Sequence, residues 1–490
     1  DVDALRATGR LPEDPAARTR VAELARAIDE IEALQATGRN QDALTRMQAL
    51  LPRVEAVAHP PLLAEALDLE HQIQAWLGLR RESAATLDRA MRAAAQAGDD
   101  RRAAEIAISR LYVHVHLLGE TAKADELIGA AETAVLRAGG SDELQLRLAS
   151  QTGLALLTLE RYDEAVAELA RAAALGERVY GHDALEQGHV LANQALVLDA
   201  AGKYADARAV HERALAIQER GLGPDHPAVA NTLQNLGINL RTQGQLDRAI
   251  EVSTRALRIV ERAYAPDSAD LAVASESLGL VYMVAQRPAE GRPYLERALA
   301  IREKHPDDAD LPKTLHNLAL LLTDLHEYAA ARRHLERSIA LKTAQHGEEG
   351  SGLASAEYAL GDLISRQAGC REALPHFQRS LALGEKGLGP DHPNLAYPLQ
   401  GIGHCERELG RPARAVSPLE RAVALTEKAG ASPVDIAAYE FQLAGALWEA
   451  GADRGRAVAV ARRARAGYAH APTDQAKAVA EIDRWLATHR

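Results

Sequence analysis

Apolar residues recur along this chain at the spacing of one helix face, in two runs separated by a short polar turn. In one stretch, Leu233, Leu236 and Leu240 mark the first run. The turn Thr242–Gln245 follows and contains a glycine, which suits the left-handed end of a helix. The second run spans residues 249–260. This pattern predicts a unit of two helices joined by a tight turn.

The unit recurs along nearly the whole chain. Each copy has a small residue just after its turn, and these eleven residues, used here as anchors, lie 40–42 residues apart. Between two of the units, Pro266 should end one helix and Asp267 should cap the next. Ser83 competes with Ala84 for one anchor. The anchors are Ala43, Ala84, Ala124, Ala165, Ala207, Ala249, Gly291, Ala331, Ala373, Ala415 and Ala457.

Two further positions in nearly every unit also carry small side chains. One lies twelve residues before the anchor, as at Gly237, and the other lies seven residues after it, as at Ala256. Composition agrees, because hydrophobic residues make up 47% of the 490 residues but aromatics only 3%. A core rich in Ala and Leu favours closely packed helices over strands. We therefore predict an all-α fold.

The repeated phrasing resembles the tetratricopeptide repeat (TPR) of the kinesin-light-chain type. GLGPDHP occurs at Gly221–Pro227 and Gly387–Pro393, and the pattern HP-x-x-A, NLG, A and RAL recurs. The resemblance is strong from Leu146 to Ala466 and weaker from Pro15 to Gly140. It implies a right-handed superhelix of about eleven helix pairs. The expected segments are a linker at 1–14, degenerate repeats at 15–145, TPR repeats at 146–470 and a capping helix at 473–490.

The beginning of the chain carries a second resemblance. Asp1–Arg6 (DVDALR), the linker Leu11–Pro15 and the degenerate early repeats resemble the C-terminal regions of bacterial Hanks-type Ser/Thr kinases, of the kind found in myxobacteria. The chain lacks the glycine-rich loop, the VAIK lysine, the HRD loop and the DFG triplet of a kinase domain. The resemblance therefore implies the non-catalytic part of such a protein.

The net charge, the apolar runs and the cysteines limit which partners and which cellular compartment fit the sequence. With 57 basic and 69 acidic residues, the net charge of −12 disfavours general nucleic-acid binding. The longest apolar run, Leu280–Ala285, is too short to span a bilayer, and no signal peptide follows Asp1. Cys370 and Cys405 form no CxxC pair, so we expect free packed thiols in a reducing compartment, although the two could approach each other across neighbouring repeats. We predict a cytoplasmic protein without membrane contact.

Catalytic patterns occur only as near misses. The phosphate-loop-like Gly221–Gly223 has His226 where a third glycine is required, and we interpret it as an inter-repeat turn. His326 and Glu327 begin an HExxH pattern that Ala330 breaks. His114 and His116 do not share a helix face, so we expect a satisfied or solvent-exposed pair rather than metal ligands. We predict no enzymatic activity, no cofactor and no metal site.

A row of arginines lies six residues after the anchors of eight consecutive units. It could form a basic ladder for phosphate, but glutamates that directly precede several of these arginines would cancel its field. We therefore interpret it as a solvated helix position. The arginines are Arg171, Arg213, Arg255, Arg297, Arg337, Arg379, Arg421 and Arg463.

The first helix of each unit lines the concave side of a TPR superhelix, where the family binds peptides. Asparagines near the small position of this helix can both donate to and accept from a peptide backbone. Because they do not occupy packed positions, we expect Asn235 and Asn317 to be replaceable by Ala without loss of folding. The predicted groove residues are Asn193, Asn231, Gln234, Asn235, Arg241, Lys313, His316, Asn317, Tyr358, Tyr397 and Arg407.

Three functions fit the sequence. The first is a non-catalytic scaffold that binds a protein or peptide in the concave groove. The second is the regulatory or sensor region of a larger kinase, which residues upstream of Asp1 would reveal. The third is a structural or oligomerising solenoid, which light scattering would test, because no sequence feature specifies an oligomeric state.

Overall fold

The computed structural model describes residues 12, 14–305, 308–348, 352–451, 453–468 and 475–489, so most of the predicted linker at 1–14 lies outside the described residues. The described residues form helices and turns, with no strand among them. The chain divides into two compact units, Asp1–Ile259 and Val260–Arg490.

The bounds of the helices follow the order of the chain. Unit 1 contains α2 (Pro15–Ala36), α3 (Asn40–Ala56), α4 (Pro60–Trp76), α5 (Arg80–Ala97), α6 (Asp100–Leu111), the π-helix η1 (Tyr112–Leu117), the 3-10 helix η2 (Thr121–Lys123), α7 (Ala124–Arg137), α8 (Asp142–Thr158), α9 (Tyr162–Tyr180), α10 (Leu185–Ala200), α11 (Tyr204–Leu222), α12 (Pro227–Thr242) and most of α13 (Leu246–Ala263). Unit 2 contains α14 (Ala269–Val284), α15 (Pro288–Arg302), α16 (Leu311–Asp324), α17 (Tyr328–His346), α18 (Gly352–Gln367), α19 (Cys370–Leu388), the 3-10 helix η3 (Pro393–Leu395), α20 (Ala396–Glu408), α21 (Pro412–Lys428), α22 (Pro433–Ala450), α23 (Arg454–Gly467) and α24 (Ala476–Thr488).

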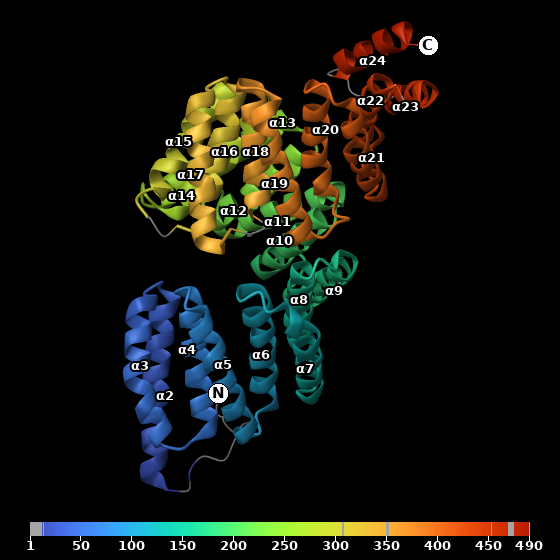
Figure 1. Ribbon diagram of the computed structural model, residues 1–490. Helices are drawn as coiled ribbons and strands as arrows, with labels where there is room; N and C mark the ends of the chain where they lie inside the picture. Colours follow the sequence, from blue (N-terminus) through green and yellow to red (C-terminus); the bar gives the residue numbers. More distant parts are fainter. Residues whose placement is uncertain are drawn as a thin grey trace. The chain divides into compact units, whose positions relative to one another are not determined.

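The predicted helix pairs are confirmed over the described residues. From α2 and α3 to α22 and α23 the described residues form eleven pairs, and within each unit Figure 1 shows the helices of neighbouring pairs side by side. In most pairs the anchor is the fourth residue of the second helix and is fully buried, as at Ala165 and Ala415. In the second pair this place belongs to Ser83, which is fully buried and donates its hydroxyl to the His71 carbonyl oxygen at 3.2 Å. Ser83, rather than Ala84, is therefore the anchor there.

Close packing explains the small residues on both sides of the anchor. A Cβ atom placed on Gly237 would lie 2.5 Å from the Ser253 hydroxyl oxygen, and one on Gly403 would lie 2.5 Å from Leu419. Ala256 is 0% exposed at the second small position. The two helices of a pair therefore approach at a distance that larger side chains would prevent.

The repeated GLGPDHP segment forms the turn between consecutive pairs. Gly223 and Gly389 end α11 and α19 with φ near +90°, a backbone conformation that favours glycine. The histidine then caps the next helix, because the side chain of His226 accepts the Ala228 N–H at 3.1 Å and that of His392 accepts the Asn394 N–H at 3.2 Å. The interpretation of this segment as an inter-repeat turn is confirmed.

In the divergent turn before α14 the predicted cap is wrong. Ser268, not Asp267, occupies the N-cap position, and its hydroxyl accepts the Leu271 N–H at 3.2 Å. Helix α14 begins at Ala269, one residue later than a cap at Asp267 would require. Ser268 therefore caps the helix in place of Asp267.

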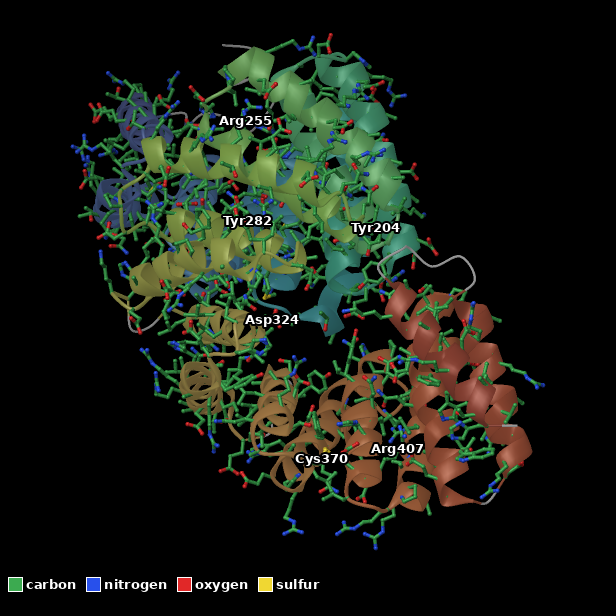
Figure 2. The ribbon with its side chains drawn as sticks, turned by 90° about the horizontal axis from the view of Figure 1, so that it is seen from above. Tyr204, Arg255, Tyr282, Asp324, Cys370 and Arg407 are labelled. Carbon is green, nitrogen blue, oxygen red and sulfur yellow. A yellow bond between two sulfur atoms is a disulfide. The ribbon has the colours of Figure 1, made fainter. Side chains whose placement is uncertain are left out.

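Six of the eight arginines in this row pair with a glutamate of the preceding helix pair, so the row forms no open basic ladder. Arg255, for example, lies on α13 (Figure 2) and contacts Glu219 of α11 at 2.5 Å, while also donating to the Pro224 carbonyl oxygen in the intervening turn. Most of these pairs are solvent-exposed, so each adds at most about 1 kcal/mol. They connect neighbouring pairs: Arg213–Glu177, Arg255–Glu219, Arg297–Glu261, Arg337–Glu303, Arg421–Glu385 and Arg463–Glu427. Arg171 pairs with Glu168 of its own helix, and Arg379 pairs with Glu357 of its own helix pair.

Cys370 and Cys405 form a disulfide, so the prediction of free thiols is wrong. Cys370 begins α19 and Cys405 lies in α20, with their Cα atoms 4.8 Å apart, and Figure 2 shows the sulfur atoms at Cys370. The two residues are 35 positions apart because each belongs to a different helix pair, and the packing of neighbouring pairs brings them together. The reducing compartment inferred from unpaired cysteines loses that support.

The chain ends in a helix that packs on the last pair. Trp485 of α24 contacts the rings of Phe441 and Trp448 at centroid distances of 6.3 and 5.8 Å. Leu486 packs against the cluster around Ile482. Residues 473, 474 and 490 of the predicted capping segment lie outside the described residues.

Candidate functional site

The first helices of the pairs in unit 2 line a cavity of about 450 Å³. Three predicted groove residues meet there: His316 from α16, Tyr358 from α18 and Tyr397 from α20. Helix α19 closes one side with the apolar Leu388, which is 44% exposed. The cavity is mainly apolar, with a few polar groups, as is usual for ligand-binding sites.

Contacts between neighbouring helices hold the walls of the cavity. A Cβ atom on Gly384 of α19 would lie 2.6 Å from a terminal carbon of the Leu395 side chain, so the glycine leaves room for this leucine. On the other side, the Ser380 hydroxyl donates to the Ala354 carbonyl oxygen at 2.8 Å and joins α19 to α18. The position of the cavity therefore follows from the small-residue pattern of the repeats.

The aromatic side chains of the cavity contact one another. The ring of Tyr358 lies 5.7 Å from that of Phe377 and 5.9 Å from that of Tyr397. Burial raises the pKa of Tyr358 to about 12, so its hydroxyl stays protonated and can donate a hydrogen bond at neutral pH. Tyr397 is 51% exposed and presents its ring to solvent.

A second cavity, of about 390 Å³, adjoins the first along the same face. It is lined by Tyr439 and Tyr468 among others, and Asn394 and Tyr397 line both cavities. Burial raises the pKa of Tyr439 to about 12. Tyr397 therefore separates two neighbouring tyrosine-containing cavities. The surface that contains both cavities is called the groove face of unit 2 below.

Asn317 already has a partner inside the protein. Its amide donates to the Glu276 carboxylate of α14 at 2.7 Å. Glu276 is 3% exposed, and its other oxygen lies 3.4 Å from Arg302, a buried side chain that also pairs with Asp308 at 2.9 Å. The amide group therefore supports a buried network, and the expectation that Asn317 is structurally dispensable is not supported by this geometry.

We expect Asn317→Ala to lower the free energy of unfolding by about 1–3 kcal/mol, because it leaves a buried Glu276 oxygen without its donor. Asn235→Ala is the matched control, since Asn235 is half-buried and should change stability by less than about 0.5 kcal/mol. Urea unfolding followed by circular dichroism measures both. Equal stabilities for the two variants would contradict a structural role of Asn317.

The remaining predicted residues of unit 2 lie outside the cavities. Lys313 is exposed on α16. Arg407 of α20, labelled in Figure 2, pairs with Glu449 of α22, with Nε 3.0 Å from a carboxylate oxygen. A Cβ atom on Gly445 would lie 2.6 Å from the same guanidinium group. Arg407 therefore holds α20 against α22.

The predicted residues of unit 1 lie on two helices and form no described cavity together. Asn231 is exposed, whereas the other four are half-buried. Burial lowers the pKa of Arg241, and no ion pair of this side chain is found among the described residues. Asn193 lies on α10, and Asn231, Gln234, Asn235 and Arg241 lie on α12.

Three cavity residues, Arg147, Ser150 and Tyr439, are not among the predicted groove residues, because they belong to units before and after those from which that set was taken. Eighteen and fifteen residues before the anchor Ala165 stand Arg147 and Ser150, which line a cavity in unit 1. Tyr439 holds the same place before Ala457 that Tyr397 holds before Ala415. Extending the two spacings to every unit would have found them.

Burial, with a smaller repulsion from Lys342, lowers the pKa of His316 from 6.5 to about 4. Below pH 6.5 the unfolded chain therefore binds a proton that the folded chain does not, and stability falls as the pH is lowered from 6.5 towards 4. Between pH 6.5 and pH 5 we expect His316 to lower the free energy of unfolding by about 1.5 kcal/mol. Urea unfolding at both pH values measures this change. In the His316→Gln variant the free energy of unfolding should fall by about 1.5 kcal/mol less over the same interval. A variant with the same pH dependence as the unchanged chain would contradict the shift.

The family model for the tetratricopeptide repeat matches residues 144–220, 191–262, 269–344 and 352–428, which together make up more than half of the chain. The chain therefore belongs to the tetratricopeptide repeat family. No curated protein matches the sequence.

Solved structures resemble this fold at low sequence identity. The apo form of RapI is 12% identical with a TM-score of 0.52, covering 83% of this chain and 98% of RapI. A Rap protein complexed with competence and sporulation factor is 12% identical with a TM-score of 0.50, covering 79% and 99%. The nearly identical TPR-like repeats of a Podosopora anserina kinesin light chain are 18% identical with a TM-score of 0.36, covering 42% and 98%. At such identities the likeness concerns the fold alone.

Two further findings bear on the kind of site. No described helix is long and apolar enough to cross a membrane. Among the described residues, no three His, Cys, Asp or Glu side chains gather in a way that could hold a metal ion. The candidate site is accordingly a pair of aromatic cavities on a repeat scaffold.

Proposed function

We propose that this chain is a non-catalytic scaffold that binds a peptide segment of a protein partner along the groove face of unit 2. The observation that carries the proposal is the pair of adjoining cavities separated by the half-exposed Tyr397. One of the structures with a similar fold is a Rap protein complexed with competence and sporulation factor, which supports ligand binding on this kind of scaffold.

The chemistry of the face indicates how such a peptide would bind. Each cavity offers tyrosine rings and a partly apolar wall, which suits one apolar or aromatic side chain of the ligand. Asn394, shared by the two cavities, and Gln400, in the second, can hydrogen-bond to the backbone between these side chains. The expected ligand is a segment with two apolar anchors separated by a few residues.

The test begins with the selection of peptides from a displayed random library on the full chain. A synthetic copy of a selected peptide is then titrated against three proteins by fluorescence anisotropy. We expect Tyr397→Ala to weaken binding by about tenfold or more, because a central aromatic residue in a binding face typically contributes this much. Tyr264→Ala is the matched control, since Tyr264 is 37% exposed in the same unit and lines neither cavity.

Two results would contradict this function. One is a library that yields no binding peptide. The other is a set of selected peptides that bind Tyr397→Ala as tightly as the unchanged chain. Melting curves of the variants serve as the folding control, because Tyr397 contributes little to the buried core.

The two other functions remain hypotheses. The regulatory region of a kinase is implied by the resemblance of the first residues, and the sequence that precedes Asp1 in the gene would test it. A purely structural solenoid predicts that neither cavity binds a ligand, and the same peptide selection distinguishes it from a scaffold.

A further inference from the structure

A separate cavity of about 330 Å³ lies within unit 1, between helices α4, α6, α8 and α10. Its apolar part is formed by Ile108, Leu146 and Val190. Its polar part contains charged groups of both signs, Arg147 and Glu186. This pairing of opposite charges differs from the two cavities of unit 2, whose described lining includes Asp435 but no lysine or arginine.

The positive group is only weakly held by the protein. Arg147 is 43% exposed, and its ion pair with Glu105 spans 3.7 Å. Glu105 is shared with two other guanidinium groups, those of Arg101 at 3.4 Å and Arg102 at 3.6 Å. Arg147 therefore keeps donors and positive charge available to a carboxylate in the cavity.

The negative group of the cavity is the carboxylate of Glu186. Glu186 lies in the first turn of α10, and no ion pair of its carboxylate is found among the described residues. A carboxylate that lines a partly apolar cavity is stabilised by an ammonium group placed beside it. Arg147 and Glu186 together offer complementary partners for a ligand that carries both charges.

Two buried polar atoms on the cavity walls also lack hydrogen-bond partners. His71 is 6% exposed, and its Nε2 has no hydrogen bond, although an Asp68 carboxylate oxygen lies 3.6 Å away. Gln151 has a buried amide oxygen without a donor. Burial lowers the pKa of His71 to about 4, so its ring is neutral at physiological pH. An unpaired buried polar group is costly, and a ligand with N–H donors would relieve that cost.

We propose that this cavity binds a free α-amino acid with an aliphatic side chain. Arg147 holds the carboxylate, Glu186 and the Gln151 amide oxygen hold the ammonium group, and Ile108, Leu146 and Val190 contact the side chain. The volume of about 330 Å³ accommodates one such molecule with a water. A peptide C-terminus would leave Glu186 without a cation. The site is independent of the peptide-binding face proposed for unit 2.

The test is isothermal titration calorimetry of the full chain with L-leucine, L-valine and L-isoleucine. We expect one molecule per chain for at least one of them. N-acetyl-L-leucine, which lacks the ammonium group, and L-leucinamide, which lacks the carboxylate, should both bind at least tenfold more weakly, because each loses a charge-assisted hydrogen bond. Competition with the selected peptide of unit 2 should be absent.

Variants of the residues that line the cavity test where the amino acid binds. Arg147→Gln and Glu186→Gln should each weaken the binding of the amino acid by roughly tenfold or more. Arg178→Gln is the matched control, since Arg178 is an exposed arginine of unit 1 that pairs with Asp142 and does not line the cavity, and it should bind normally. The proposal is overturned if none of the three amino acids binds, if N-acetyl-L-leucine binds as tightly as L-leucine, or if Arg178→Gln is as impaired as the two cavity variants.

Discussion

Reduction of the Cys370–Cys405 disulfide should lower the free energy of unfolding of unit 2 by roughly 4 kcal/mol. The bond closes a loop with a sequence separation of 35 residues, and such a cross-link removes conformational freedom from the unfolded chain. The cysteines are 8% and 0% exposed and pack among apolar residues that include Phe377. The folded helices therefore lose little contact when the bond opens.

The measurement is urea unfolding of the full chain with and without a phosphine reductant. The double variant Cys370→Ser, Cys405→Ser should be destabilised by a similar amount and should not respond to the reductant. Mass spectrometry after alkylation, under denaturing conditions without reductant, counts the free thiols. Two free thiols in the protein as purified, or a transition unaffected by reduction, would contradict a stabilising disulfide.

Ala256→Arg should destabilise unit 1 by about 3 kcal/mol or more. Ala256 is fully buried on α13, seven residues after the anchor Ala249, where the repeats bring helices into close contact. A guanidinium group there must either push the helices apart or become buried without a partner. Both outcomes disrupt a well-packed helix contact.

Glu251→Arg on the same helix is the matched control, because Glu251 is exposed and the new side chain can extend into solvent. It should shift the free energy of unfolding by less than about 0.5 kcal/mol. Urea unfolding followed by circular dichroism compares the two variants. If Ala256→Arg unfolds like the unchanged chain, the repeat register on which the whole interpretation rests is wrong.

The register of the repeats was readable because each unit meets the same steric demand. A second helix can approach the first only where a small residue stands, so Gly237 and Ala256 recur with the period of the fold. The helices, their order and their pairing follow from this pattern. The N-cap at Ser268 was missed because Asp and Ser are both good caps, and only the backbone decides which residue occupies the position.

The candidate site was predicted less completely. His316, Tyr358 and Tyr397 do line one cavity, since the spacing to the anchor indicates which side of the first helix a residue occupies. The same spacing cannot show whether a side chain already forms a hydrogen bond or an ion pair with another residue of the protein. Asn317 donates to Glu276, and Arg407 pairs with Glu449, each about one unit distant in sequence.

The repeat, its period and the all-α class follow from the amino-acid sequence alone, because these depend on side-chain size and polarity at fixed intervals. The contacts between successive pairs depend instead on how the folded helices pack. The disulfide of Cys370 and Cys405 and the ion pairs such as Arg255–Glu219 join residues about one repeat apart. Their formation depends on the angle and distance at which neighbouring pairs pack, and that geometry arises from all the packed side chains together rather than from any local pattern.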